Sequence, residues 1–175
     1  MYGIEGTALN WFKSYLKNRS QVVKINSTLS EKKQLRYGVP QGSILGPILF
    51  NSYIAPLSKI AEQNGIENEK FADDGQLAIA FKTKNLNTQQ RAVTNMEKCI
   101  EDIRCFLKKK EISYNGDKTE CSLFGTTQQL KKIKFDSSEV YGIQIQIEKK
   151  VKNLGVWFDS TLSMTGQVNK VCSLG

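Results

Sequence analysis

Histidine is absent from the 175-residue sequence, and this absence removes several kinds of chemistry. Histidine is the commonest general base in enzymes and a member of the Ser-His and Cys-His pairs of hydrolases. The four cysteines, Cys99, Cys105, Cys121 and Cys172, form no Cys-x-x-Cys pair, so the sequence has no zinc-binding pattern. Catalysis would therefore use carboxylates, lysine or a metal ion. We expect the cysteines to be reduced thiols of an intracellular protein.

Long apolar stretches are also lacking. No run approaches the roughly 18 residues of a membrane-spanning helix, and Met1 does not open a secretory signal. We therefore expect no membrane partner. Hydrophobic residues make up 39% of the chain, which at this length is enough for one domain with a hydrophobic core.

Acidic residues are scarce relative to basic ones. The chain has 25 lysine and arginine residues against 17 aspartate and glutamate residues, a net charge of +8. Between Met1 and Pro40, seven bases stand against two acids. This excess of positive charge favours a polyanionic partner such as nucleic acid. A basic surface that is only solvated explains the same composition equally well.

The spacing of apolar residues predicts a mixture of helices and short strands. Apolar residues three and four positions apart predict helices, and period-two alternation predicts strands. The expected helices cover residues 7–18, 48–54, 88–107 and 164–174, and the expected strands cover 21–25, 76–81, 121–124, 143–147 and 152–158. The helix that Asn87 or Thr88 would cap has the most regular apolar stripe, and we expect that stripe to pack on a sheet.

Asp73 and Asp74 stand next to each other before the strand expected at 76–81. Asp74-Gly75 is a strong turn signal, so we expect both carboxylates at the tip of a hairpin. Asp-Gly turns on protein surfaces commonly serve backbone geometry alone. The alternative is that adjacent carboxylates supply hard oxygen ligands to divalent cations, which phosphoryl or nucleotidyl transfer requires.

A loop rich in glycine and proline extends from Gly38 to Pro47. Ser43 is a candidate N-cap for the helix at 48–54, and Gly42 permits close backbone approach. Such a loop can place backbone N–H groups against a phosphate or a sugar, but a capped structural turn explains the same residues. Further along the chain, Lys118 is expected to be held at the start of the strand at 121–124.

Three stretches taken together resemble one family. Gly38 to Gly46 (GVPQGSILG), Phe71 to Asp74 (FADD) and Lys118 to Glu120 (KTE), in this order, resemble the reverse transcriptase domain of non-LTR retrotransposons. The segments Tyr2 to Arg19 and Leu154 to Asp159 agree with that resemblance. The PQG and ADD motifs, in this order and at this spacing, are its specific part.

The resemblance implies an α+β fold, the partial palm of a right-hand polymerase, in which an antiparallel sheet is backed by helices. Residues 1–125 would form part of the fingers and palm. Residues 126–160 would form the strands between palm and thumb with the primer grip, and residues 161–175 the truncated start of the thumb. The implied activity is RNA-directed DNA synthesis by two-metal nucleotidyl transfer.

The same resemblance assigns roles to residues of the chain. Asp73 and Asp74 match catalytic carboxylates that ligate two Mg²⁺ ions, or Mn²⁺ in their place, with Asp73 the more direct ligand. Lys118 matches a lysine that assists the leaving pyrophosphate. The implied contacts of nucleotide and template are Arg36, Pro40, Gln41 and Gly42, and those of the primer are Leu154, Gly155 and Trp157. The implied partners are an RNA template, a DNA primer and dNTPs, and the implied location is the nucleus.

The chain also departs from the family pattern. Phe71 stands where the family usually has tyrosine, and Gly75 where it often has threonine or serine. The first catalytic aspartate of the family belongs to a strand upstream of the segment that begins at Gly3, and no residue here matches it. We therefore expect the chain alone to be inactive and to need the N-terminal part of the same polyprotein.

Two other interpretations remain open at this stage. In one, the chain is a non-catalytic remnant that binds nucleic acid through its basic N-terminal helix and hairpin. In the other, it is a decayed reading frame that no longer folds, because a central palm strand is lacking. Salt-dependent binding that survives Asp73→Ala would support the first, and cooperative unfolding would argue against the second.

Overall fold

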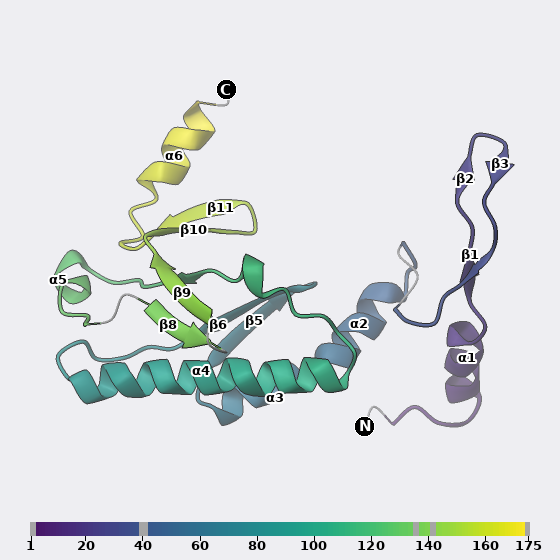
Figure 1. Ribbon diagram of the computed structural model, residues 1–175, viewed down its shortest axis with the longest axis horizontal. Helices are drawn as coiled ribbons and strands as arrows, with labels where there is room; N and C mark the ends of the chain where they lie inside the picture. The colour runs from purple at the N-terminus through teal and green to yellow at the C-terminus, as the bar shows by residue number, and fades with distance from the viewer. Residues whose placement is uncertain (1–2, 39–41, 135–136, 141–142, 174–175) are drawn as a thin grey trace. The chain divides into compact units, whose positions relative to one another are not determined.

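A computed structural model describes residues 3–38, 42–134, 137–140 and 143–173, with the side chains of 117 and 137–145 left out. The chain divides into two compact units, Met1–Ile54 and Ala55–Gly175 (Figure 1). The domain boundaries expected near residues 125 and 160 stay predictions. Small, mostly antiparallel sheets combine with helices, so the predicted α+β class is confirmed at this level.

The first unit joins two helices through a narrow ribbon of strands. Strand β1 pairs with β4 and β2 with β3, and Asn26 turns the ribbon with a φ of 53°. The single strand expected at 21–25 is interrupted between β1 and β2. The elements are α1 (Gly6–Leu16), β1 (Ser20–Gln21), β2 (Lys24–Ile25), β3 (Thr28–Leu29), β4 (Lys33–Gln34) and α2 (Gly46–Ile54).

Helix α2 begins at Gly46, and the Leu45 carbonyl oxygen accepts its first intrahelical hydrogen bond, so Leu45 and not Ser43 is at the N-cap position. The Ser43 hydroxyl oxygen still accepts a 3.0 Å hydrogen bond from the Gly46 N–H at the start of the helix. Pro56 does more than close this helix, because it is the first residue of a further helix, α3 (Pro56–Gln63), where its missing N–H costs nothing. Helix α3 was not predicted from the apolar spacing of the sequence.

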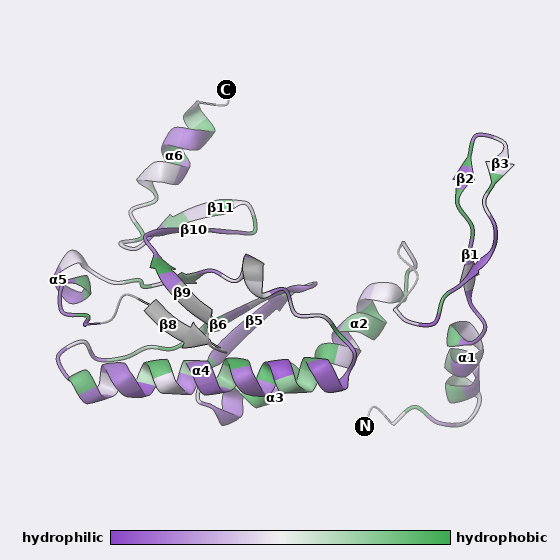
Figure 2. Ribbon diagram, viewed as in Figure 1, coloured by the Kyte–Doolittle hydropathy of each residue, from purple (hydrophilic) through white to green (hydrophobic). Residues whose placement is uncertain are grey.

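The core of the second unit lies between α3, the long helix α4 (Leu86–Lys109) and the hairpin of β5 (Glu67–Phe71) and β6 (Asp74–Ala78). Asn85 caps α4 through a 2.8 Å hydrogen bond that its side-chain oxygen accepts from the Asn87 N–H, so neither of the expected caps, Asn87 or Thr88, is the N-cap. Hydrophobic and hydrophilic residues interleave along α4 (Figure 2), as an amphipathic helix requires. The fully buried core residues are Ala61, Ile66 and Cys99, with Leu77, Ile79, Met96 and Ile103 packed around them.

The rest of the second unit consists of short elements. Strands β7, β9 and β8 form a three-stranded sheet, and β10 pairs with β11 in a separate hairpin. A capping box of Thr126 and Gln129 starts α5, in a stretch where the apolar spacing predicted neither helix nor strand. The bounds are η1 (Gly116–Lys118), β7 (Cys121–Ser122), α5 (Thr127–Leu130), β8 (Ser137–Val140), β9 (Ile143–Glu148), β10 (Lys150–Asn153), β11 (Val156–Asp159) and α6 (Thr165–Cys172).

All four cysteines are free thiols. Burial raises the pKa of the Cys99 thiol, with a smaller contribution from Asp102, and burial also raises the pKa of Cys121. Of the helices in the described ranges, none has both the length and the apolar character that crossing a membrane would take.

Candidate active site

The two adjacent carboxylates lie at the turn between β5 and β6. Phe71 is paired with Asp74, so Ala72 and Asp73 form a two-residue turn. The predicted hairpin is confirmed, but the turn expected at Asp74-Gly75 is wrong: Asp74 opens β6 and Gly75 is paired with Lys70. The pairing of β5 sets this register, and its polar sequence, ENEKF, gave no strand signal.

Ala72 is the strained residue of the turn, because its φ of 53° lies in the left-handed region. A two-residue hairpin turn of this kind usually has glycine at its first position. A side chain with a Cβ atom pays about 1–2 kcal/mol in the left-handed region. The strained residue therefore directly precedes the first carboxylate.

The register places the Asp74 side chain on the face of the hairpin away from the helices. Side chains alternate along a strand, so Asp74 shares its face with Phe71, Gln76 and Glu69. The opposite face carries the half-buried Asn68, Lys70 and Leu77. Glu69 lies diagonally across from Asp74, and it was not among the predicted site residues because β5 was not predicted.

Asp73 and Asp74 are both exposed. Within the described ranges, no hydrogen bond or ion pair engages either carboxylate. Lys70 is the lysine nearest to the two aspartates in the strand register, because it is paired with Gly75. Lys70 is half-buried, and burial lowers its pKa. The two carboxylates thus keep their oxygen atoms open to solvent.

Two exposed carboxylates fit a divalent cation in donor chemistry but do not enclose one. Carboxylate oxygens are the ligands that Mg²⁺ prefers, usually together with water and substrate phosphates. Among the residues that the structure describes, no group of three or more His, Cys, Asp or Glu side chains could hold a metal ion.

Lys118 ends the 3₁₀ helix η1 and is exposed. The strand that it was expected to introduce, β7, begins three residues later at Cys121, as predicted. The next residue, Thr119, anchors this segment through a 2.5 Å hydrogen bond between its hydroxyl group and that of Tyr114. No contact in the described ranges joins Lys118 to Asp73 or Asp74.

The residues expected to hold a primer form a hairpin of their own. Leu154 and Gly155 have φ angles of 46° and 87° and make the two-residue turn between β10 and β11. The single strand expected at 152–158 is therefore wrong, because two consecutive residues with positive φ reverse the chain. Trp157 follows on β11 and is half-buried. Glu120 of the KTE motif reaches this hairpin, where its carboxylate accepts a 3.4 Å hydrogen bond from the Lys152 N–H.

Asp159, which the sequence placed only at the end of the expected primer-grip segment, is the centre of a hydrogen-bonded turn. Its carboxylate accepts hydrogen bonds of 2.7–3.1 Å from the backbone N–H and hydroxyl groups of Thr161 and Ser163 and from the Met164 N–H. These bonds, led by that of the Thr161 hydroxyl, hold the pKa of Asp159 well below its usual range. The signal in the sequence is an aspartate followed by closely spaced Ser and Thr, which favours such a turn.

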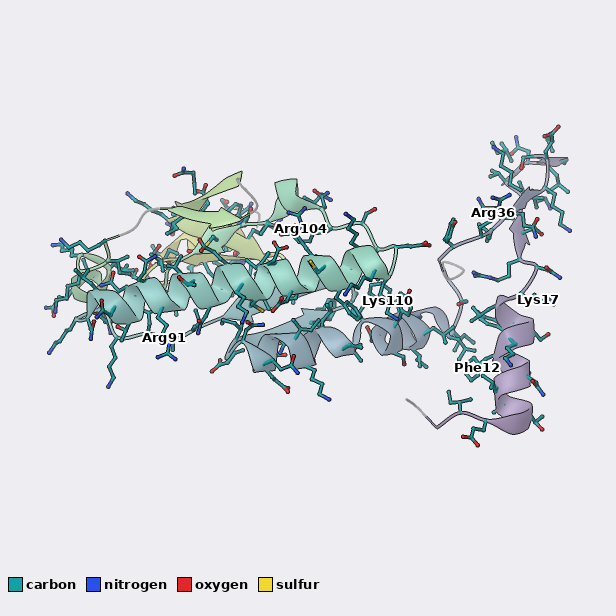
Figure 3. All side chains as sticks on the ribbon, turned by 60° about the horizontal axis from the view of Figure 1, so that its bottom comes forward. Phe12, Lys17, Arg36, Arg91, Arg104 and Lys110 are labelled. Carbon is teal, nitrogen blue, oxygen red and sulfur yellow. The ribbon has the colours of Figure 1, made fainter. Side chains whose placement is uncertain are left out.

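The expected nucleotide and template contacts belong to the first unit. Arg36 is exposed after β4, and Figure 3 labels it. Gly42 has a φ of 79°, which favours glycine, and Pro40 and Gln41 lie outside the described residues. The Arg19 guanidinium donates to the carbonyl oxygen atoms of Leu16 and Gly38, which ties the end of α1 to a residue two positions before Pro40 of the PQG motif.

The chain belongs to the family described as reverse transcriptase (RNA-dependent DNA polymerase), whose model matches residues 2–158. It is 26% identical over 156 residues to the "Probable RNA-directed DNA polymerase from transposon BS" of Drosophila melanogaster, covering 86% of this chain and 16% of that protein. It is 46% identical over 74 residues, 41% of this chain and 8% of the relative, to the "Probable RNA-directed DNA polymerase from transposon X-element" of the same organism.

A third relative is the "RNA-directed DNA polymerase from mobile element jockey" of Drosophila melanogaster, 22% identical over 165 residues. The match covers 91% of this chain and 17% of the relative. The chain thus corresponds to a small part of these polymerases. No solved structure gives a significant match. The family predicted from the PQG, ADD and KTE stretches is confirmed.

Proposed function

We propose that this chain is the part of a retrotransposon RNA-directed DNA polymerase that supplies two of its catalytic carboxylates, within a right-hand palm. The observation that carries the proposal is the position of Asp73 and Asp74, exposed and unpaired in the described ranges at a strained two-residue turn, in a chain of the reverse transcriptase family. The expected substrates are dNTPs, and the expected partners are an RNA template and a DNA primer. We place this activity in the nucleus.

Each residue has a part in the proposed reaction. Two Mg²⁺ ions, when bound, supply charge stabilisation for nucleotidyl transfer. Asp73 presents its oxygen atoms to them from the turn, and Asp74 presents its carboxylate on the outer face of β6 beside the primer end. Lys118 offers a positive charge to the departing pyrophosphate. Leu154, Gly155 and Trp157 hold the primer, and Arg36 with Pro40, Gln41 and Gly42 contacts template and nucleotide.

We also propose that a further carboxylate, from the N-terminal part of the polyprotein, completes the metal site. Two adjacent carboxylates give hydrated Mg²⁺ few ligands, and the relatives are several times longer than this chain. A site that lacks an essential positioning group loses orders of magnitude in rate. The chain alone should therefore bind Mn²⁺ weakly and synthesise no DNA.

The test is Mn²⁺ binding followed by paramagnetic broadening of NMR signals. Signals of residues 71–75 should broaden first in the 175-residue chain, and Asp73→Asn should abolish this effect. Glu67→Gln is the matched control, because Glu67 is an exposed acid at the far end of the same hairpin. If the Asp73→Asn variant showed the same broadening as the parent, the assignment of the metal ligands would be contradicted. Primer extension by the chain alone would contradict the need for a further carboxylate.

A second candidate function is nucleic-acid binding without catalysis through the first unit. The ribbon carries exposed Lys24 and Lys33 together with the exposed apolar side chains of Val22, Val23 and Ile25. This function predicts binding that weakens steeply with salt and is unchanged by Asp73→Ala. Binding that is insensitive to salt would exclude it.

A further inference from the structure

Two segments of the second unit contain bases and no acids. Residues 75–96 include Lys82, Lys84 and Arg91, and residues 121–134 include three lysines, Lys131, Lys132 and Lys134. Arg91 projects from α4 in Figure 3. Asp136, the nearest acid beyond the second segment, lies outside the described residues. The two segments together would carry a concentrated positive charge if the fold brought them together.

The buried side chain of Gln89 brings them together. This residue is 3% exposed, and its amide group donates hydrogen bonds to the carbonyl oxygen atoms of Thr83 (2.8 Å) and Lys132 (3.1 Å). Its own oxygen accepts a 3.2 Å hydrogen bond from the Lys134 N–H. A buried amide with these partners holds the two segments at a defined separation.

The result is an open hollow lined by Thr83, Lys84, Leu86, Lys131, Lys132 and Lys134. The four lysines are exposed, and within the described ranges no carboxylate pairs with any of them. The hollow adjoins the N-terminal end of α4, whose dipole adds further positive potential. It lies toward the end of β6 that faces away from the Ala72–Asp73 turn.

We propose that this hollow, here called the lysine hollow, binds the phosphate backbone of a nucleic acid. Lysines act on phosphates as mobile point charges, and four unpaired ones around an open surface favour a polyanion over a single small anion. Among the described residues that line the hollow none is aromatic, so these residues give bases no surface to stack on. The contact should therefore be independent of base sequence.

This inference extends the proposed function, because a polymerase must hold nucleic acid beyond the reacting atoms, but its test uses binding and no synthesis. The variant replaces Lys131, Lys132 and Lys134 with glutamine. The matched control replaces Lys98, Lys108 and Lys109, three exposed lysines of α4, and so changes the net charge equally. Binding to a labelled single-stranded oligonucleotide is measured by fluorescence anisotropy between 50 and 300 mM NaCl.

The hollow variant should bind at least about tenfold more weakly at 100 mM salt, and its log–log salt slope should fall by ~2, since single strands lose ~0.7 per phosphate contact. The control should change much less, and oligonucleotides of different base sequence should give the same loss. Equal losses in both triple variants would overturn the proposal. Asp73→Asn should leave this binding unchanged, so a failed metal site and a failed lysine hollow are distinguishable.

Lysine acetylation footprinting on the unaltered chain gives a second measurement that needs no substitution. The oligonucleotide should protect Lys84, Lys131, Lys132 and Lys134 more than Lys98 and Lys108. Equal reactivity with and without oligonucleotide would overturn the proposal. Binding to vesicles that contain phosphatidylserine is the third measurement. If the hollow variant lost vesicle binding but kept normal oligonucleotide binding, the site would be one for a lipid surface and the proposal would be overturned.

Discussion

The backbone N–H of Trp157 donates a 3.0 Å hydrogen bond to the side-chain oxygen Oε1 of Gln167, and this bond joins β11 to α6. The ammonium group of Lys170, one turn further along α6, lies 5.4 Å from the centre of the Trp157 ring. Both contacts hold the start of the proposed thumb against the proposed primer grip.

Replacing Lys170 should loosen this contact. A cation over an indole ring at an exposed site contributes about 0.5–1 kcal/mol. We expect Lys170→Ala to lower the free energy of unfolding by about that amount and to change the emission of Trp157, measured in urea unfolding of a Trp11→Phe background. Lys170→Arg should retain the contact. Identical emission from Lys170→Ala and the parent would contradict the prediction.

Ala72→Gly should stabilise the hairpin. Relief of the left-handed conformation gains about 1–2 kcal/mol, whereas the extra freedom of glycine in the unfolded chain costs about 0.4–1 kcal/mol. The net expectation is a gain of about 0.5–1 kcal/mol in the free energy of unfolding, seen as a higher urea midpoint. Ala72→Val should be destabilising, because a branched side chain tolerates positive φ poorly. A lower midpoint for Ala72→Gly would show that the turn is not strained.

Asp159 should make the stability of the chain sensitive to acid. Its folded pKa lies below the unfolded value of about 3.9. The stabilisation is therefore fully present above that value and is lost as the pH falls below about 4 toward the folded pKa. Asp159→Asn should be less stable than the parent at pH 7, and the difference should shrink below pH 4. A constant difference between pH 7 and pH 3 would contradict this origin.

Gln89→Leu should be strongly destabilising. The substitution leaves two carbonyl oxygen atoms and one N–H group without the partners that Gln89 provides. A buried polar group left unpaired costs about 1–3 kcal/mol, and partial access of water to the loops lowers the sum, so we expect a loss of about 2–4 kcal/mol. Gln90→Leu, on the exposed neighbour, is the control and should change the urea midpoint little.

The sequence predicted the elements whose apolar spacing is regular. Helices α1, α4 and α6 and strand β9 lie where that spacing places them. Strand β5 was missed because Glu67–Phe71 is polar on both faces, and its pairing partner, not its own composition, makes it a strand. The predicted strand at 152–158 failed at Leu154, because only tertiary pairing reveals a turn whose first residue is an ordinary leucine.

The predictions for the site were likewise partly confirmed and partly incomplete. The motifs placed Asp73 and Asp74 at a hairpin, and the pairing confirms that. They gave no hint that the bent residue is Ala72, since alanine carries no turn signal. The structural roles of Asp159 and Gln89 were missed because they depend on backbone groups that come together only in the fold. The catalytic and binding roles remain predictions that the experiments above test.

The two-residue turn at Ala72–Asp73 has a consequence for how this region can vary in length. The side chains of β6 alternate between the helix-facing and outer faces, so a change in turn length that shifts the pairing of β6 with β5 by one residue would send Asp74 toward the helices and expose Leu77. Point substitutions at the tip should therefore be accepted far more readily than single-residue insertions or deletions. In a library of such variants sorted into folded and unfolded proteins, variants with one residue added to or removed from the turn should be much rarer among the folded proteins than point variants.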